Sequence, residues 1–215
     1  MVQAMDGRSF GVEPPAAYWF TKRLIDVTLS FLALVAFAIP MAVIALLVKL
    51  DDPSSPIFFR QQRCGAGGRR FGLIKFRTMV RNADELKEEL RTQSVVAWPD
   101  FRVYDDPRIT RIGRFLRKAS LDELPQLMNV LKGDMSLVGP RPTSFDVSTY
   151  SLWHTGRLEF RPGITGPWQV LGRDSMNFDE RCRLEISFFR HPSIWAEVKL
   201  VAATLPIVMR RTGTA

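Results

Sequence analysis

The chain has 215 residues, 46% of them hydrophobic, and a formal net charge of +8, which is typical of a folded protein and argues against a disordered or fibrous chain. Its two cysteines, Cys64 and Cys182, are too few for a disulfide scaffold or a four-cysteine zinc module. The two histidines, His154 and His191, lie outside any metal-ligand spacing, which argues against chemistry at a histidine-bound metal.

The sequence predicts three parts in chain order. Residues 1–21 are predicted to be a mobile N-terminal tail, because glycine, proline and acidic residues are scattered there without a period. Residues 22–50 are predicted to be a membrane helix hairpin. Residues 51–215 are predicted to be one cytoplasmic domain, a location consistent with the reduced state expected for two isolated cysteines.

The membrane prediction rests on residues 27–48, which contain no charged side chain. A straight helix of this length would measure about 33 Å, enough to cross a bilayer core of about 30 Å. Lysine and arginine flank both ends, and the positive-inside rule then favours keeping both ends in the cytoplasm. Pro40 lies near the middle, where it removes a backbone donor. We therefore predict a re-entrant helix broken at Pro40, with a single kinked span as the alternative.

The next segments alternate between strand and helix patterns. Residues 57–62 and 70–78 resemble strands around a glycine-rich turn and predict a β-hairpin. Residues 108–118 carry apolar side chains on one face and arginines around it, a pattern typical of a helix that lies on an anionic membrane. Residues 194–209 predict a second interfacial helix.

The positive charge is concentrated. Residues 60–118 hold 15 basic and 7 acidic side chains, so the net charge of this segment equals that of the whole chain. Such a block indicates an anionic partner, which could be nucleic acid, an anionic bilayer or a phosphorylated substrate, unless it is only a solvated basic face.

Two interpretations are open for the acidic pair that follows the basic helix. Ser120 and Glu123 match a capping box, so Asp122 and Glu123 could simply begin a helix. They also precede two stiff, proline-containing turns that carry Arg141 and Arg161, and cations on rigid turns suit phosphate binding. A carboxylate beside such cations can bind Mg²⁺ or attack phosphorus.

Four long motifs occur in a fixed order along the chain. They are KRLIDVTLSFLALVAFAIPM, IFFRQQRCGAGGRRFGLIKFRTM, LRKASLDELPQLMNVLKGDMSLVGPRP and RPGITGPWQVLGR. Together they make the chain resemble the bacterial sugar transferases, the monotopic polyprenyl-phosphate phosphoglycosyl transferases, in the small single-domain form that initiates exopolysaccharides. The resemblance covers roughly residues 22–211.

This resemblance implies an enzyme that moves a sugar 1-phosphate from a UDP-sugar donor to polyprenyl (undecaprenyl) phosphate. The implied products are polyprenyl-diphosphate-sugar and UMP, formed in a ping-pong sequence through a covalent aspartyl-phosphosugar. The resemblance also implies Mg²⁺ as cofactor, the first step of surface glycan assembly as the role, and the cytoplasmic face of the bacterial inner membrane as the location. A homodimer is left open.

The resemblance assigns roles to individual residues. Asp122 is implied to be the nucleophile and Mg²⁺ ligand, and Glu123 its partner in the catalytic dyad. Arg117 and Arg141 match arginines near the phosphates, and Pro40 matches the proline that breaks the membrane helix. Lys75, with Arg77 in the same KFRTM run, and Arg161 are further candidates for phosphate binding. Exposed strand cations are the ordinary interpretation of Lys75 and Arg77.

The expected fold is α+β and mostly α, with a re-entrant membrane helix, a small β-hairpin and interfacial amphipathic helices around the catalytic domain. Two other function classes agree with part of the sequence. A membrane-anchored nucleic-acid binder fits the charge but lacks a recognisable stacking or helix-turn-helix pattern, so no nucleic-acid partner is expected. A scaffold without catalysis would have no need for the Asp122-Glu123 pair.

Overall fold

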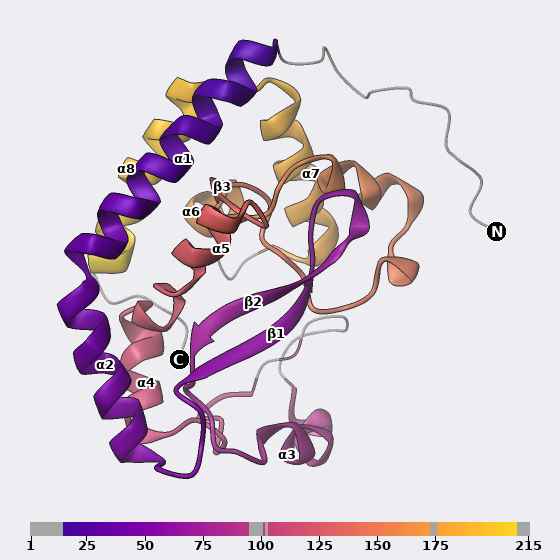
Figure 1. The fold of residues 1–215 in the computed structure, drawn as a ribbon. Coiled ribbons are helices and arrows are strands. Elements are labelled where there is room, and N and C mark those ends of the chain that lie inside the picture. Colours follow the sequence, from indigo (N-terminus) through magenta and orange to yellow (C-terminus); the bar gives the residue numbers. More distant parts are fainter. Residues whose placement is uncertain (1–14, 95–100, 102, 173–175, 210–215) are drawn as a thin grey trace.

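The computed structural model describes residues 15–94, 101, 103–172 and 176–209, which form a mostly helical α+β structure with two small two-stranded sheets (Figure 1). The predicted fold class is confirmed at this level. The α-helices are α1 (Ala16–Ala36), α2 (Ala38–Asp51), α3 (Ala83–Glu89), α4 (Arg111–Lys118), α5 (Gln126–Lys132), α6 (Pro167–Leu171), α7 (Phe178–Arg190) and α8 (Ile194–Met209). The strands are β1 (Phe58–Cys64), β2 (Arg70–Phe76), β3 (Ser136–Val138) and β4 (Gly163–Thr165).

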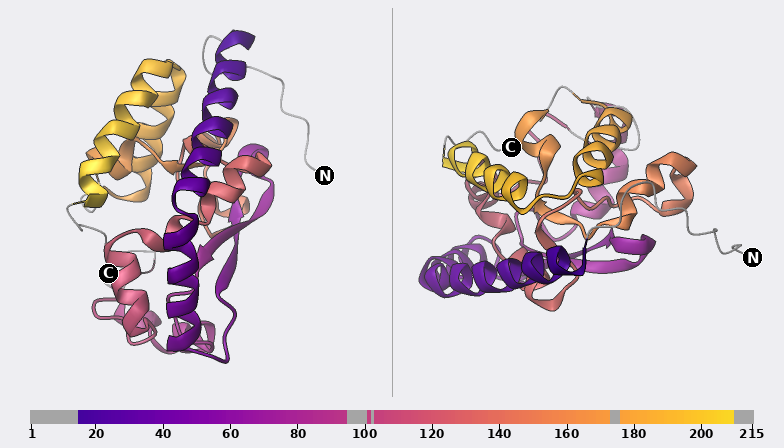
Figure 2. Two further views of the ribbon diagram at one scale, coloured as in Figure 1. Left: turned by 60° about the vertical axis from the view of Figure 1, so that its left-hand side comes forward. Right: turned by 90° about the horizontal axis from the view of Figure 1, so that it is seen from above.

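Helices α1 and α2 form a bent pair along one side of the molecule (Figures 1 and 2). They meet at Phe37 at an angle of 63°, and Pro40 is the third residue of α2. Because proline has no amide hydrogen, the carbonyl of Ala36 loses its normal helical partner at this bend. In the described part of the chain no single helix is long and apolar enough to cross a membrane. The bent pair taken together has the length and the apolar composition that a membrane segment needs.

Apolar side chains at the bend are exposed to solvent. Ile39 is 79% exposed and Val35 is 61% exposed. Helix α1 begins at Ala16, so residues 16–21, predicted as part of the tail, form its first turns; residues 1–14 lie outside the described ranges. The early start has a physical cause, because the Tyr18 hydroxyl donates a hydrogen bond to Glu197 on α8 and so ties the first turns of α1 to the body of the protein.

The inner face of α1 is polar and docks on the rest of the chain. Lys22 donates to the carbonyl of Val138 at 3.0 Å and pairs with Glu197 at 2.5 Å. Asp26 accepts from the Ser136 hydroxyl at 2.8 Å and from the Leu137 amide at 3.0 Å. These contacts attach α1 to β3, the strand that leads into the turn around Arg141. Lys22 is therefore a buried docking residue rather than a free flanking charge.

Strands β1 and β2 form the predicted antiparallel hairpin, with Phe58 opposite Phe76 and Cys64 opposite Arg70. At the turn, Gly67 and Gly68 have φ values of 61° and 74°, which glycine adopts without strain. The second sheet is the short parallel pair β3 and β4. Gly139, directly after β3, packs so closely on the backbone of residues 161–163 that a side chain there would collide with it.

One apolar cluster joins the bent pair to the centre of the chain. Ile44 and Val48 of α2 pack with Phe76 of β2 and Leu116 of α4. Leu121 and Leu124 pack against the same cluster. These two leucines flank Asp122 and Glu123 in the sequence, so the turn that holds the acidic pair belongs to the same apolar cluster as α2.

The predicted basic helix over residues 108–118 is shorter than expected. Helix α4 begins after Thr110, whose side chain accepts a hydrogen bond from the amide of Gly113 at 3.0 Å. Arg108 lies before the helix and is buried in an ion pair with Asp106. Phe115 and the basic residues Arg111, Arg114 and Lys118 are exposed. The C-terminal helix is confirmed as α8, with Trp195 72% exposed near its start.

Candidate active site

The acidic pair lies in a single turn of 3-10 helix, η3 (Leu121–Glu123), between α4 and α5. The capping-box interpretation of Ser120 and Glu123 is wrong. Ser120 adopts a left-handed conformation with φ 55°, its amide donates to the carbonyl of Arg117 at the end of α4, and its side chain caps nothing. Helix α5 begins only after Pro125. Ser120 therefore follows the end of α4, and its carbonyl accepts from the Glu123 amide at 3.3 Å to begin η3, while its side chain makes no capping bond.

Glu123 connects two cations from distant parts of the chain. One carboxylate oxygen, Oε1, accepts hydrogen bonds from Lys75 Nζ at 3.1 Å and from Arg141 Nη2 at 2.9 Å. Lys75 comes from β2 and Arg141 from the turn after β3. These two cations hold the pKa of Glu123 well below its usual range, so Glu123 stays ionised. Lys75 is thus part of the cluster and is not a free strand cation.

Asp122 differs from its neighbour in both burial and contacts. It is 7% exposed, and Lys75 Nζ is 4.0 Å from its Oδ2. It accepts no hydrogen bond from any described residue. Burial raises the pKa of Asp122 above the usual aspartate range, and the charge of Glu123 adds to this effect while Lys75 opposes it. Two adjacent carboxylates therefore have pKa values displaced in opposite directions, which is typical of catalytic pairs.

Arg117, at the end of α4, approaches the pair from another side. Its Nε donates to the hydroxyl of Thr78 at 2.9 Å. The charges of Arg117 and Asp122 interact, and burial lowers the pKa of the guanidinium from its ordinary value. Thr78 was not among the predicted residues, although it directly follows the KFR run that contains Lys75.

Arg161 is the predicted phosphate-binding residue that does not join this cluster. Its side chain is exposed, and among the described residues no hydrogen bond or ion pair connects it to Asp122 or Glu123. The backbone carbonyl of Arg161 instead packs closely against Gly139, beside the turn that carries Arg141. A role for Arg161 in substrate binding stays a prediction.

An open pocket lies beside Glu123. Its lining includes two polar residues that the sequence argument missed, Arg63 and Gln126, together with Lys75 and Arg141. Arg63 Nη1 donates to the carbonyl of Pro142 at 3.1 Å, so it also contacts the Arg141 turn. The period-two alternation of the strands could have found it, because Arg63 pairs with Phe71, and residues 71, 73 and 75 share one face of β2.

The arrangement suits the handling of a phosphorylated substrate. A buried carboxylate without a hydrogen-bond partner is a candidate nucleophile, and three cations stand around it and its neighbour. Arginine can bind phosphate oxygens bidentately, lysine binds them as a point charge, and both offset the negative charge of the phosphate.

Comparison with known proteins gives a consistent result. The model of a family described as bacterial sugar transferase matches residues 17–211. The chain is 41% identical over 199 residues to a galactosyl transferase CpsE of Streptococcus agalactiae, covering 92% of this chain and 44% of the relative. It is 41% identical over 199 residues to an undecaprenyl-phosphate galactose phosphotransferase of Salmonella typhimurium, covering 90% of this chain and 41% of the relative.

A shorter relative is matched over most of its own length. The exopolysaccharide production protein ExoY of Sinorhizobium fredii is 38% identical over 199 residues, covering 90% of this chain and 88% of the relative. The chain thus spans less than half the length of the first two relatives and nearly all of this one.

Proposed function

This chain belongs to the bacterial sugar transferase family, and from that premise we propose that it transfers a sugar 1-phosphate from a UDP-sugar to polyprenyl phosphate. The predicted family and the predicted class of enzyme, a sugar-phosphate transferase, are confirmed by the comparisons. The observation that carries the specific reaction is the buried Asp122, which lies beside a Glu123 that is bound to Lys75 and Arg141.

The names of the relatives support both the acceptor and the role. One is an undecaprenyl-phosphate galactose phosphotransferase and another an exopolysaccharide production protein. We propose undecaprenyl phosphate as acceptor and the first step of exopolysaccharide or other surface glycan assembly as the role. The scaffold and nucleic-acid-binding alternatives are not favoured, because neither accounts for the cluster of cations around a buried carboxylate pair.

The first half-reaction begins at Asp122. An ionised Oδ of Asp122 attacks the phosphorus that carries the sugar, a new P–O bond forms to the carboxylate, and the bond to the bridging oxygen of the diphosphate breaks. UMP leaves with that oxygen and the electron pair. Arg117, Lys75 and Arg141 offset the negative charge that the attacking carboxylate and the diphosphate bring together.

The second half-reaction returns Asp122 to its starting state. A phosphate oxygen of the polyprenyl phosphate attacks the same phosphorus, the P–O bond to the carboxylate breaks, and polyprenyl-diphosphate-sugar is released. Because UMP departs before the lipid reacts, both half-reactions can use one set of cations, as a ping-pong sequence requires.

The family implies Mg²⁺, and the donor set fits a weakly protein-bound ion. Among the described residues no three metal-ligating side chains cluster, so the chain by itself provides no closed cage. Mg²⁺ commonly binds one or two carboxylates together with substrate phosphates, and Asp122 has carboxylate oxygens without a hydrogen bond to offer. Asp122 would hold the ion with the phosphates of the donor, and the ion, when bound, offsets their charge.

We propose that the bent pair α1–α2 is a re-entrant membrane segment on the cytoplasmic face of the bacterial inner membrane. Its exposed apolar bend, together with the exposed Trp195 of α8 and Phe115 of α4, supports this proposal. Helix α2 shares an apolar cluster with the leucines on either side of the acidic pair, so a bilayer around the bend would bring the lipid phosphate near that pair. A homodimer stays a prediction.

Membrane topology is tested by labelling single cysteines in sealed vesicles with a membrane-impermeant maleimide. Ala17→Cys and Asp51→Cys lie at exposed positions on the two arms, and Ile39→Cys lies at the bend. We expect both arms to react in inverted vesicles and neither to react in spheroplasts, with Ile39→Cys protected in both. The wild-type chain, whose own cysteines are buried, is the unlabelled control. Reaction of the two arms from opposite sides would show a span and overturn the re-entrant proposal.

The reaction is tested by UMP release from protein purified in nanodiscs with undecaprenyl phosphate, Mg²⁺ and a panel of UDP-sugars. We expect release that requires both the lipid and Mg²⁺ and that identifies the accepted sugar. Folded protein that releases no UMP with any donor would contradict the proposed function.

Lys75 is expected to control the pH dependence of the first half-reaction. Asp122 must be ionised to attack, so kcat/KM falls as the pH drops through its raised pKa. Because Lys75 lowers that pKa, Lys75→Met should move the acidic limb of the pH–rate profile to higher pH. Arg77→Met is the matched control, since Arg77 bonds the carbonyl of Pro56 and should leave the limb unmoved. A limb that stays in place in Lys75→Met would contradict this role.

A further inference from the structure

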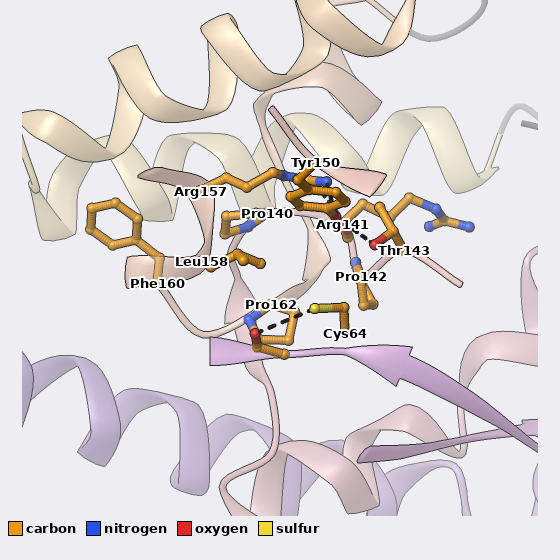
Figure 3. Close-up of a pocket in the computed structure, with 11 residues that line it drawn as sticks. Cys64, Pro140, Arg141, Pro142, Thr143, Tyr150, Arg157, Leu158, Phe160 and Pro162 are labelled. Carbon is orange, nitrogen blue, oxygen red and sulfur yellow. Dashed lines mark hydrogen bonds between the residues drawn. The ribbon is translucent and has the colours of Figure 1, made fainter. Parts of the chain in front are cut away.

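The backbone of Arg141 is held by two side chains from a distant part of the sequence. Glu185 Oε1 accepts a hydrogen bond from the Arg141 amide at 2.9 Å. Arg157 Nη2 donates to the Arg141 carbonyl at 2.8 Å and also pairs with Glu185 Oε2 at 2.6 Å. Figure 3 shows Arg157 extending along a pocket toward Tyr150 and Arg141. The two hydrogen bonds therefore satisfy both polar backbone groups of one residue.

This ion pair is deeply buried. The side chain of Glu185 is 0% exposed and that of Arg157 is 5% exposed. Removing two charges from water costs several kcal/mol per ion, which their attraction offsets only when further hydrogen bonds complete the arrangement. Here the further bonds of Glu185 and Arg157 end on the backbone of the residue whose guanidinium binds Glu123.

The local sequence explains why Arg141 needs such partners. Pro140 and Pro142 flank it, and neither can donate a backbone hydrogen bond. Arg141 lies beyond the end of β3, so its own amide and carbonyl are outside the β3–β4 ladder. Buried backbone groups without a partner are costly, so side chains have to satisfy them.

The pair is itself fixed by its surroundings. The guanidinium of Arg157 lies 5.6 Å from the centre of the Phe178 ring, and its Nη1 lies 3.4 Å from the Tyr150 hydroxyl. Tyr150 in turn is 2.6 Å from the hydroxyl of Thr143, on the chain just after the Arg141 turn. Arg157 lies on η5 (Leu152–Glu159) and Glu185 on α7, so these later elements contact the turn that carries Arg141.

We propose that Arg157 and Glu185 are positioning residues for the donor diphosphate, acting by holding the Arg141 backbone so that its guanidinium faces Glu123 and the substrate. The proposal rests on the proposed function. Neither residue bonds Asp122 or Glu123 in the described structure, and their hydrogen bonds to Arg141 link them to the acidic pair.

Double-mutant kinetics separate positioning from general stability. Arg157→Lys keeps the positive charge toward Glu185 but loses the planar geometry that serves the carbonyl and the carboxylate together. A misplacement of about 1 Å in an active site can cost about 100-fold, so we expect kcat/KM for the donor to fall 10- to 100-fold, mainly through a higher KM. In an Arg141→Ala background the same change should cost less than about twofold, because residues that act as one unit are not additive.

A second variant distinguishes the loss of positioning from a loss of folding. Replacing a buried ion pair by apolar side chains of similar volume is often tolerated, so Arg157→Met with Glu185→Leu should fold, as checked by thermal melting, and should show the loss found for Arg141→Ala. Arg108→Lys is the matched control, because Arg108 forms an equally buried pair with Asp106 that does not contact Arg141. Its kcat/KM should stay within twofold of wild type.

Hydrogen exchange gives a readout that does not depend on turnover. Between Gly139 and Thr143 the only backbone amide belongs to Arg141, because residues 140 and 142 are prolines. We expect its exchange to rise at least tenfold in the Met/Leu double variant and to stay slow in Arg108→Lys. Unchanged exchange, or equal fold losses of kcat/KM for Arg157→Lys with and without Arg141, would overturn the positioning role. If the wild-type protein releases no UMP, the proposed function is refuted but the positioning proposal is not. The exchange measurement still tests whether Arg157 and Glu185 fix the backbone of Arg141.

Discussion

Asp122→Asn is expected to lower UMP release at least about a thousandfold while the protein still folds and inserts into the membrane. The amide is nearly the same size as the carboxylate, and Asp122 accepts no hydrogen bond from a described residue whose loss would unfold the site. Its burial makes removal of the charge favourable for stability, because a buried carboxylate is costly. The expected loss therefore reflects the missing nucleophile and not a damaged fold. UMP release and thermal melting of the same preparation measure the two effects separately.

The control for this variant is Asp105→Asn. Asp105 is exposed and has φ 49°, a conformation that asparagine tolerates as well as aspartate does. It should keep wild-type activity.

Arg141→Ala should lower activity less than Asp122→Asn does, because it weakens phosphate binding without removing the attacking group. Near-normal turnover in Asp122→Asn, or a greater loss in Arg141→Ala, would contradict the assignment of Asp122 as nucleophile. Mass spectrometry of a phosphosugar on Asp122 would support it directly.

Glu123→Gln is expected to lower kcat about 100-fold with KM for the donor unchanged or reduced. Glu123 Oε1 holds both Lys75 and Arg141, and a neutral amide cannot hold two cations in place. The freed cations remain able to bind the ground-state diphosphate, so binding survives while the orientation required in the transition state is lost. Steady-state kinetics with a single UDP-sugar measure both constants.

Glu123→Gln is expected to shift the acidic limb of the pH–rate profile in the direction opposite to Lys75→Met. The charge of Glu123 raises the pKa of Asp122, so its removal should move the acidic limb of the kcat/KM profile to lower pH. Glu88→Gln, which changes an exposed glutamate on α3, should alter neither the rate nor the profile. A rise in KM with unchanged kcat would show that Glu123 serves binding only, and a limb that moves to higher pH would contradict its coupling to Asp122.

The mostly helical class, the hairpin, the break near Pro40 and the family were all predictable from the sequence. These features depend on local rules: apolar runs, glycine turns, proline without an amide, and long motifs in a fixed order. The acidic pair was also found in this way. Ser120 shows where local rules fail, because its spacing to Glu123 fits a capping box although the residue ends α4 in a left-handed conformation.

The tertiary structure decided which side chains meet. Lys75 matched an exposed strand cation by pattern, and only the packing of β2 beside η3 places it within 4.0 Å of both carboxylates. Arg161 resembled Arg141 in the sequence, since each lies beside a proline in a stiff turn, yet its side chain is exposed. Arg157 and Glu185 carried no sequence signal, because their partners are the backbone groups of Arg141.

By itself, therefore, the sequence determined the class of the protein, the β-hairpin, the broken N-terminal helix and the identity of the acidic pair, because each depends on neighbouring residues. Only the tertiary structure decided the cation set, the opposite pKa displacements of Asp122 and Glu123 and the hold on Arg141. These depend on burial and on distances between residues 16 to 48 positions apart in the sequence, which no local pattern contains.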